Sequence, residues 1–178
     1  MSAPRRPAED HTSAFQALGE ETFTLRPIAI ARSPYKERYG TPHQATAVRG
    51  TREGVPVEGA IELLPHVPLE ALEGLGGFDY VWALYVFHMN EGWSAQVRPP
   101  RGPRVKRGVL ATRAPHRPNP LGLSALRLVA VEERRLVVRG LDLLDGTPVL
   151  DLKPYIPYAD AFPDARAGWV DEIEREEG

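Results

Sequence analysis

The sequence has no cysteine, no hydrophobic run long enough to cross a bilayer and no repeated alternation of strand-like and helix-like segments. Without cysteine there are no disulfide bonds and no thiolate metal sites, which fits a reducing compartment. The first ten residues, MSAPRRPAED, lack the apolar core of a secretion signal. Without β–α repeats, a Rossmann-type parallel sheet has no support. We therefore expect a cytoplasmic protein that does not enter a membrane.

Acidic residues are missing from one long stretch of the chain. No Asp or Glu occurs between Gly92 and Val131, although the formal net charge of the whole chain is −2. The basic residues of this stretch are Arg98, Arg101, Arg104, Lys106, Arg107, Arg113, Arg117 and Arg127. A local basic region in a slightly acidic chain indicates a polyanionic partner, and arginine suits phosphate because its guanidinium donates two parallel hydrogen bonds. The pattern favours a nucleic-acid partner.

Short alternating apolar segments, with 16 glycines and 18 prolines among 178 residues, predict an all-β fold with many turns. We expect a small single-domain β-barrel of six to seven mostly antiparallel strands with one or two short helices. The expected strands are Phe23–Ala31, Val55–Leu64, Phe78–Met89, Gly108–Thr112, Leu121–Val131, Arg135–Leu144 and Thr147–Lys153, and Ala45–Arg49 could form a further short strand. Phe78–Met89 is almost wholly apolar, so it is predicted to be buried on both faces.

The remaining segments define the expected organisation around this barrel. Residues 1–21 are polar and predict a flexible leader, residues 22–165 form the barrel, and residues 166–178 form an acidic tail that can be helical. Helical patterns are confined to Leu69–Leu75 and Gly168–Glu177. Asn90–Arg107 is expected to be a long basic loop and Tyr155–Asp164 an irregular segment.

The segment Gly108–Ser124, GVLATRAPHRPNPLGLS, carries three prolines within six residues. Proline fixes the backbone angle φ and removes a hydrogen-bond donor, so this segment predicts a stiff loop between strands. A stiff loop loses little entropy when it meets a ligand. It presents four polar side chains for binding: Arg113, His116, Arg117 and Asn119. The alternative is a proline-rich connector with a solvated basic face.

Four blocks stand out in order: Arg32–Lys36 (RSPYK), Phe87-His88, Ala111–Ser124 (ATRAPHRPNPLGLS) and Asp142–Tyr155 (DLLDGTPVLDLKPY). Together they resemble the TsaA/YaeB-like family, also called TrmO, over roughly Phe23 to Asp164. The resemblance implies a small β-barrel methyltransferase that uses S-adenosylmethionine. It further implies a homodimer with the cofactor near the subunit interface, and methylation of N6 of threonylcarbamoyl-adenosine beside the tRNA anticodon.

The resemblance also implies which residues contact the cofactor. The matching positions are Pro42, His43, Gln44, His88, Met89, Arg113, Leu123, Asp142, Leu143, Leu144 and Asp145. Two positions depart from the usual family pattern, since His43 stands where arginine is usual and Ala114 where serine is frequent. Candidates for tRNA binding, chosen from the basic stretch and the stiff loop, are Arg104, Arg107, His116, Arg117 and Asn119.

The catalytic base is left open by the sequence, with Asp151 and Tyr155 as candidates. Methyl transfer from a sulfonium is an in-line displacement, and the carbamoyl group acidifies the adenosine N–H, so a modest base suffices. Structural alternatives exist for each candidate. Asp145 can serve only its Asp-Gly turn, His88 can be a core histidine, and Tyr155 can pack under the barrel. Asp151 can pair with Arg113 or Lys153. The histidines lack metal-ligand spacing, so no metal is expected.

Three functions remain open on this evidence. The first is a tRNA methyltransferase, the second a non-catalytic RNA-binding barrel, and the third a methyltransferase of the same fold that acts on a small molecule. The basic stretch favours the first two, whereas the cofactor-block residues favour the first and third.

Overall fold

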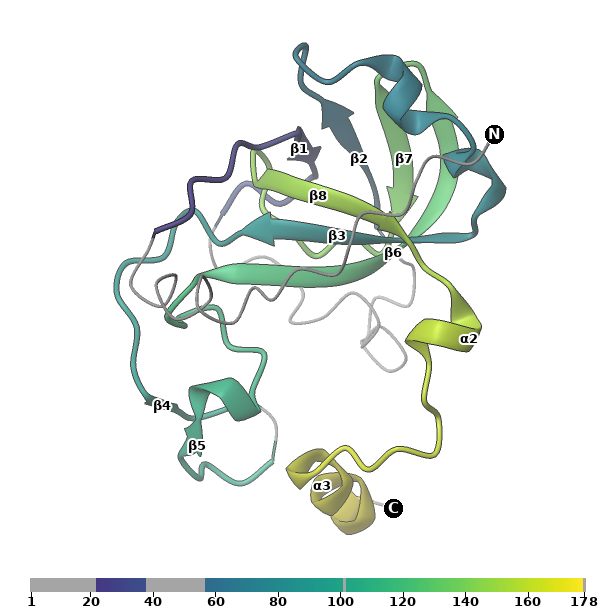
Figure 1. The fold of residues 1–178 in the computed structure, drawn as a ribbon. Helices are drawn as coiled ribbons and strands as arrows, with labels where there is room; N and C mark the ends of the chain where they lie inside the picture. The colour runs from purple at the N-terminus through teal and green to yellow at the C-terminus, as the bar shows by residue number, and fades with distance from the viewer. Residues whose placement is uncertain (1–21, 38–56, 101, 178) are drawn as a thin grey trace, which may run out of the picture.

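In the computed structural model, which describes residues 22–37, 57–100 and 102–177, six strands close into an antiparallel barrel (Figure 1). Around the barrel the order is β1-β2-β7-β6-β3-β8, and β8 pairs with β1 to close it. The strands are β1 (Ala29–Arg32), β2 (Glu58–Leu63), β3 (Tyr80–Val86), β6 (Leu121–Glu132), β7 (Arg135–Arg139) and β8 (Pro148–Pro154). The all-β barrel expected from the sequence is confirmed.

The barrel interior is filled by alternate residues of each strand, because successive side chains point to opposite faces. Ile61, Leu126 and Leu136 are fully buried there. Alanines occupy three of the other inward positions: Ala29, Ala31 and Ala83. A barrel with fewer than about eight strands is too narrow for large side chains from every strand. Small residues at these positions therefore allow the barrel to close.

One end of the barrel, called here the motif rim, is formed by segments 33–37, 87–120 and 140–147, which follow β1, β3 and β7. The opposite rim holds two 3-10 turns, η2 (Leu69–Leu72) and η3 (Leu75–Gly77). Leu69–Leu75 is therefore not one continuous helix as predicted, since Gly74, with φ of 78°, separates the two turns. Arg134 closes this opposite rim by donating hydrogen bonds to the carbonyls of Leu64 (3.1 Å) and Val67 (2.9 Å).

Outside the barrel, a small lobe is formed by β4 (Gln96–Val97), β5 (Arg107–Gly108), the 3-10 turn η4 (Val109–Ala111) and the helix α3 (Trp169–Glu177). β4 and β5 pair with each other (Figure 1). The expected C-terminal helix is confirmed by α3. Its Trp169 indole donates a 2.8 Å hydrogen bond to the carbonyl of Ala111, which attaches the helix to the lobe.

Three expectations about individual segments are wrong. β3 is fully buried only on its inner face, and Tyr80 on its outer face is 40% exposed, because a barrel lining has one covered side. Gly108–Thr112 is not a strand, since the amide of Val109 bonds to Ala95 and the chain then turns into η4. Asn90–Arg107 is not a simple loop, since it contains β4 and begins β5.

The segment Tyr155–Asp164 also differs from its prediction, because it contains the short helix α2 (Pro157–Asp160). Asp160 accepts a hydrogen bond from the amide of Ile156 (2.7 Å) and another from the indole of Trp82 (3.1 Å), which ties α2 to β3. The leader and the strand expected at Ala45–Arg49 lie outside the described residues. No helix in the described part of the chain is long and apolar enough to span a membrane.

Candidate functional site

The strand directions bring the four sequence blocks to the motif rim. Antiparallel neighbours alternate in direction, so the chain leaves β1, β3 and β7 at the same end at which it enters β6 and β8. Residues 32–36, 87–88, 111–124 and 142–147 therefore meet there although they lie far apart in the sequence. Their convergence makes the motif rim the candidate site.

Asp145 joins two of these blocks. Its carboxylate accepts a hydrogen bond from the backbone amide of Ser33 (3.1 Å) and forms an ion pair with Lys36 (2.5 Å). The Ser33 hydroxyl donates to the carbonyl of Leu143 at 2.6 Å. These bonds to Lys36 and Ser33 hold the pKa of Asp145 below its ordinary value. Asp145 thus does more than make the Asp-Gly turn, because it fastens the segment after β1 to the segment after β7.

A second polar group crosses the barrel mouth and consists of Tyr85, Ser124 and Asp142. The Ser124 hydroxyl donates to Asp142 Oδ1 at 3.0 Å, and the Tyr85 hydroxyl lies 3.1 Å from Ser124 Oγ. The β6–β7 ladder ends at the pair Arg127 with Arg139, so Ser124 meets Asp142 beyond it, where the chain has already left β7.

Gly122 makes space for the phenol of Tyr85. The two residues are paired across β3 and β6, and a Cβ atom on Gly122 would lie 2.2 Å from Cε2 of Tyr85. On its other side the Tyr85 ring packs edge-on against Phe87, with centroids 5.3 Å apart. Burial and the nearby Asp142 charge raise the pKa of Tyr85, whereas the Ser124 hydrogen bond and Arg113 lower it. Tyr85 is therefore a neutral hydrogen-bond donor at ordinary pH.

The stiff loop is braced from within. Arg117 Nη1 donates to the carbonyl of Thr112 at 3.1 Å, and the Thr112 hydroxyl accepts from the amide of Ala114 at 3.2 Å. Arg113 is exposed, and its charge acts on Tyr85. His116 is half-buried and Asn119 is exposed in the same loop. The two arginines therefore differ: Arg117 holds the loop together, and Arg113 lies close to the Tyr85 end of the polar group.

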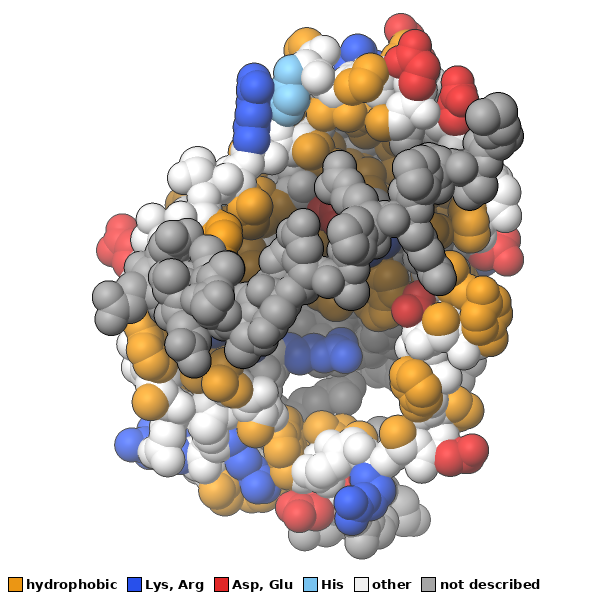
Figure 2. Space-filling view, in the orientation of Figure 1, with side chains coloured by type: hydrophobic (Ala, Val, Ile, Leu, Met, Phe, Trp, Pro, Cys, Tyr) orange, Lys and Arg blue, Asp and Glu red, His pale blue; other side chains and the backbone are white. Residues whose placement is uncertain are grey.

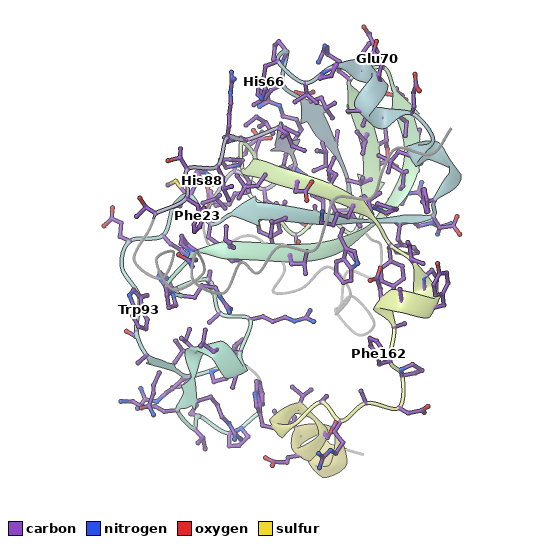
Figure 3. The ribbon with its side chains drawn as sticks, in the orientation of Figure 1. Phe23, His66, Glu70, His88, Trp93 and Phe162 are labelled. Atoms are coloured by element: carbon purple, nitrogen blue, oxygen red, sulfur yellow. The ribbon has the colours of Figure 1, made fainter. Side chains whose placement is uncertain are left out.

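The remaining expected cofactor contacts fall in three groups. His88 is exposed just beyond the end of β3 (Figure 3), so the alternative of a core histidine is wrong. Met89 and Leu123 are 53% and 54% exposed. Leu143 is buried in the core, and it meets the rim through its backbone carbonyl, while Leu144 is half-buried. Pro42, His43 and Gln44 lie outside the described residues.

The basic residues of the lobe are not equivalent. Arg104 is exposed, whereas Arg107 is half-buried, with its guanidinium carbon 5.4 Å from the ring centroid of Trp169 and an ion pair to Glu172 at 3.5 Å. Basic side chains gather over β4 and β5 in Figure 2, where Arg98, Arg104 and Lys106 are exposed. The lobe therefore offers a basic surface in which Arg107 is already engaged by α3.

The two candidate bases lie away from the polar group at the barrel mouth. Asp151 pairs with Leu84 on the outer face of the barrel and forms an ion pair with Lys153 at 2.8 Å, one of the two partners considered from the sequence. Tyr155 follows β8 at the opposite rim, where its ring packs against Trp82 and Tyr80. The structure thus agrees with the alternative considered from the sequence, in which Tyr155 packs against other aromatic side chains.

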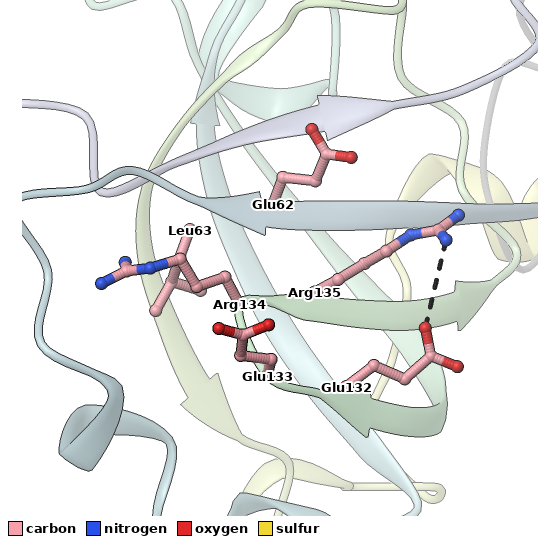
Figure 4. A pocket seen from close by; sticks show the side chains of 6 residues that line it. All are labelled: Glu62, Leu63, Glu132, Glu133, Arg134 and Arg135. Atoms are coloured by element: carbon pink, nitrogen blue, oxygen red, sulfur yellow. Dashed lines mark ion pairs between the residues drawn. The ribbon is translucent and has the colours of Figure 1, made fainter.

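A pocket of about 520 Å³ also lies at the opposite rim, around the β6–β7 turn (Figure 4). It is lined by Glu62, Leu63, Glu132, Glu133, Arg134 and Arg135. It contains none of the residues expected to function, and its acidic and basic side chains are mixed. No group of three or more potential metal ligands occurs among the described residues.

Sequence patterns did not single out Tyr85 or Ser124. One signal was available for Ser124, because Gly122, Ser124, Leu126 and Leu128 share the inner face of β6, and serine is polar at a position that faces the core. Tyr85 shares its face with Val81 and Ala83 in the same way. Their pairing with Asp142 depends on the register between strands, which alternation within one strand does not supply.

Comparisons with known proteins match this chain at the level of sequence and of fold. Residues 30–161 match the family described as the tRNA-methyltransferase O N-terminal domain. The tRNA (adenine(37)-N6)-methyltransferase of Escherichia coli is 41% identical over 157 residues, which cover 84% of this chain and 64% of that protein. The human enzyme of the same name is 37% identical over 162 residues, covering 90% of this chain and 36% of that protein.

A solved structure agrees with these sequence matches. The crystal structure of TrmO from Pseudomonas aeruginosa superimposes with a TM-score of 0.69 at 43% sequence identity, covering 85% of this chain and 64% of that chain. This chain thus spans about two thirds of the length of its bacterial relatives and about one third of the human one.

Proposed function

The chain belongs to the tRNA-methyltransferase O N-terminal domain family, and from this membership we propose that it binds S-adenosylmethionine and transfers the methyl group to tRNA. The proposed target is N6 of threonylcarbamoyl-adenosine next to the anticodon. Supporting this target, relatives from bacteria and human are named tRNA (adenine(37)-N6)-methyltransferases. The observation that carries the proposal is the convergence of the four sequence blocks on the motif rim.

The side chains at the motif rim suit the chemistry of this cofactor. S-adenosylmethionine carries a sulfonium, an ammonium and a carboxylate, and it supplies the methyl group when bound. A carboxylate such as that of Asp142 attracts the cationic groups and accepts hydrogen bonds, while an arginine such as Arg113 pairs with a carboxylate. We assign these two residues, together with His88 and Met89 just beyond β3, to cofactor binding. Asp145 supports the site by fastening its loops.

The basic surface of the lobe supports tRNA as the second substrate. The side chains of Arg98, Arg104 and Lys106 are exposed on the surface of the lobe. Exposed cations of this kind bind phosphates. His116, Arg117 and Asn119 in the stiff loop extend this basic surface toward the barrel mouth. If tRNA is the substrate, the protein acts where tRNA is found. We therefore propose the same cytoplasmic location that the sequence predicts.

A homodimer is part of the proposal. Its support is the outer face of the barrel, where Tyr80, Leu123 and Val129 are 40–54% exposed and could be covered by a second copy. Light scattering over a range of protein concentrations tests this point. A monomer mass at every concentration would contradict it.

The experiment for the main proposal combines cofactor binding with analysis of the product. Calorimetric titration with S-adenosylmethionine should show saturable binding, and mass spectrometry of digested tRNA should show methylated threonylcarbamoyl-adenosine after incubation with protein and cofactor. Cofactor binding with every tRNA nucleoside unchanged would favour a methyltransferase that acts on a small molecule. tRNA binding without cofactor binding would favour a non-catalytic RNA-binding barrel.

A further inference from the structure

We propose that Ser124 and Tyr85 are positioning residues, which hold the carboxylate of Asp142 in the orientation in which it binds the cofactor. The inference rests on the proposed function, since the ligand concerned is S-adenosylmethionine. Ser124 ends the third sequence block and Tyr85 lies outside all four, and neither residue is among the expected contacts. The three side chains come from β3, β6 and the segment after β7, so together they connect three parts of the barrel wall.

Proton counting gives the hydrogen bonds a direction. An ionised carboxylate only accepts, so the single hydroxyl proton of Ser124 goes to Asp142 Oδ1. Ser124 Oγ then has only lone pairs to offer Tyr85, and the Tyr85 hydroxyl must donate to it. The result is a directed series from Tyr85 to Ser124 to Asp142. Each bond polarises the next, which strengthens the hold on the carboxylate.

The two hydroxyls of this series are buried on the inner face of the barrel, where apolar side chains would fill the same space. Ser124 and Tyr85 are 7% and 4% exposed, and a buried hydroxyl costs stability unless it is hydrogen-bonded. Alanine and phenylalanine at the two positions would keep the packing without polar groups to satisfy. Gly122, which leaves room for the phenol, is a further adaptation of β6 to this arrangement. A need to hold the Asp142 carboxylate in one orientation accounts for the two buried hydroxyls and for Gly122.

The second acid of the rim provides a contrast within the same segment. Asp145 is held by the cationic Lys36 and by the amide of Ser33, in a contact between two loops. Asp142 has the neutral Ser124 hydroxyl among its contacts, and a hydroxyl orients a carboxylate without itself cancelling the negative charge. Of the two acids considered from the sequence, we assign Asp142, which ends the series of hydroxyls, to the cofactor and Asp145 to the loops.

Four variants test the series by calorimetric titration with S-adenosylmethionine and by steady-state methylation of tRNA. Ser124→Ala removes the donor and should weaken cofactor binding roughly 10-fold, as expected for a hydrogen bond to a charged group. Ser124→Thr keeps the hydroxyl and should restore most of the affinity. Tyr85→Phe keeps the ring and should weaken binding by about 3-fold. Tyr80→Phe, the same change at the other end of β3, is the matched control and should leave the affinity unchanged.

Two further readouts separate positioning from a merely structural role. The KM for the cofactor should rise in Ser124→Ala, while kcat at saturating cofactor changes by less than about 2-fold. The double variant Tyr85→Phe/Ser124→Ala should bind no more weakly than Ser124→Ala alone, because Tyr85 acts through Ser124. Thermal unfolding of each variant shows whether the fold is kept. If Ser124→Ala loses stability and Ser124→Thr does not rescue binding, the role is structural.

Other outcomes overturn the inference more directly. If folded Ser124→Ala binds the cofactor as tightly as the wild type, the inference is wrong. It is also wrong if the two substitutions weaken binding additively in the double variant. Failure of the proposed function has a different signature. If the wild type binds S-adenosylmethionine but leaves tRNA unmethylated, the tRNA assignment fails, while the binding data still decide on the series. If the wild type binds no cofactor, both fail together.

Discussion

The barrel and the lobe of this protein are held together by different interactions. The barrel encloses side chains such as Ile61, Leu126 and Val149, each with no exposed area. In the described part of the lobe, only Val109 and Ile173 among the hydrophobic residues are buried, and α3 is attached by contacts of Trp169 and Arg107 and by the packing of Ile173 against Gly102. Apolar burial stabilises in proportion to its area, whereas exposed polar contacts contribute little each.

The difference suggests a division of labour between the two regions. The barrel fixes the polar group of Tyr85, Ser124 and Asp142, in the orientation that the proposed cofactor site requires. The lobe presents exposed cations, whose charge attracts a phosphate over distances longer than a hydrogen bond, so attraction begins before close contacts form. From these contacts we infer that the rigid barrel holds the proposed cofactor and that the weakly attached lobe holds the proposed polyanion. Four predictions test the contrast.

The largest effect is expected where glycine is replaced inside the barrel. Gly122→Ala places a Cβ atom 2.2–2.3 Å from two ring carbons of Tyr85, so the strand or the phenol must move. We expect a loss of about 2–3 kcal/mol in the free energy of unfolding, measured by urea denaturation. The matched control is Gly108→Ala in the lobe, where nothing lies within 4 Å and φ is −55°, and it should change stability by less than about 0.5 kcal/mol. Equal losses would remove the contrast.

The next effect concerns the attachment of α3. Trp169→Ala removes both the hydrogen bond to Ala111 and the ring beside Arg107, so we expect faster hydrogen exchange throughout α3. The unfolding free energy of the barrel should change by less than about 1 kcal/mol. Trp169→Phe retains a ring for Arg107 and should have an intermediate effect. Slower exchange in α3, or loss of the barrel, would contradict a weakly attached lobe.

A smaller effect distinguishes two arginines of the lobe. Each phosphate contact that releases a counterion contributes about one unit to the slope of log affinity against log salt. Arg104→Ala should lower this slope for tRNA by about one unit, measured by titrations at several salt concentrations. Arg107→Ala should lower it less, because Glu172 and Trp169 already engage its guanidinium. The opposite order would mean that α3 leaves Arg107 when tRNA binds.

The smallest effect is expected from the ion pair of Asp145 with Lys36, where the Lys36 side chain is 66% exposed. The pKa of Asp145 is lowered in the folded protein, so the contact stabilises the fold above the unfolded pKa of about 4 and is lost as pH falls through the folded value. Asp145→Asn should therefore lower the melting temperature at pH 6 more than at pH 3. Asp151→Asn, on the outer face, serves as the comparison. A larger decrease in the melting temperature of Asp145→Asn at pH 3 than at pH 6 would contradict a stabilising role of the ion pair between Asp145 and Lys36.

Much of the barrel could be predicted from the sequence because alternation within a strand reports which face is buried. Leu121–Val131 and Thr147–Lys153 were expected within one or two residues of β6 and β8. The contact of Ser124 with Asp142 could not be predicted in this way, since it joins β6 to a segment beyond the end of β7. The lobe could not be predicted for another reason. Its strands are only two residues long, and η4 is held by the distant Trp169, so no local pattern encodes these elements.

The register of β6 against β3 also links correct folding to the ability to bind ligand. A slip by one residue would turn Ser124 and Gly122 outward and bring Leu123 into the barrel, because the side-chain period of a strand is two. Such a chain would place a leucine where the Tyr85 phenol needs space, and it would move the Ser124 hydroxyl away from Asp142. The register that keeps the barrel well packed is thus the same register that assembles the proposed cofactor site. Titration with the proposed cofactor would accordingly report the fraction of correctly folded protein.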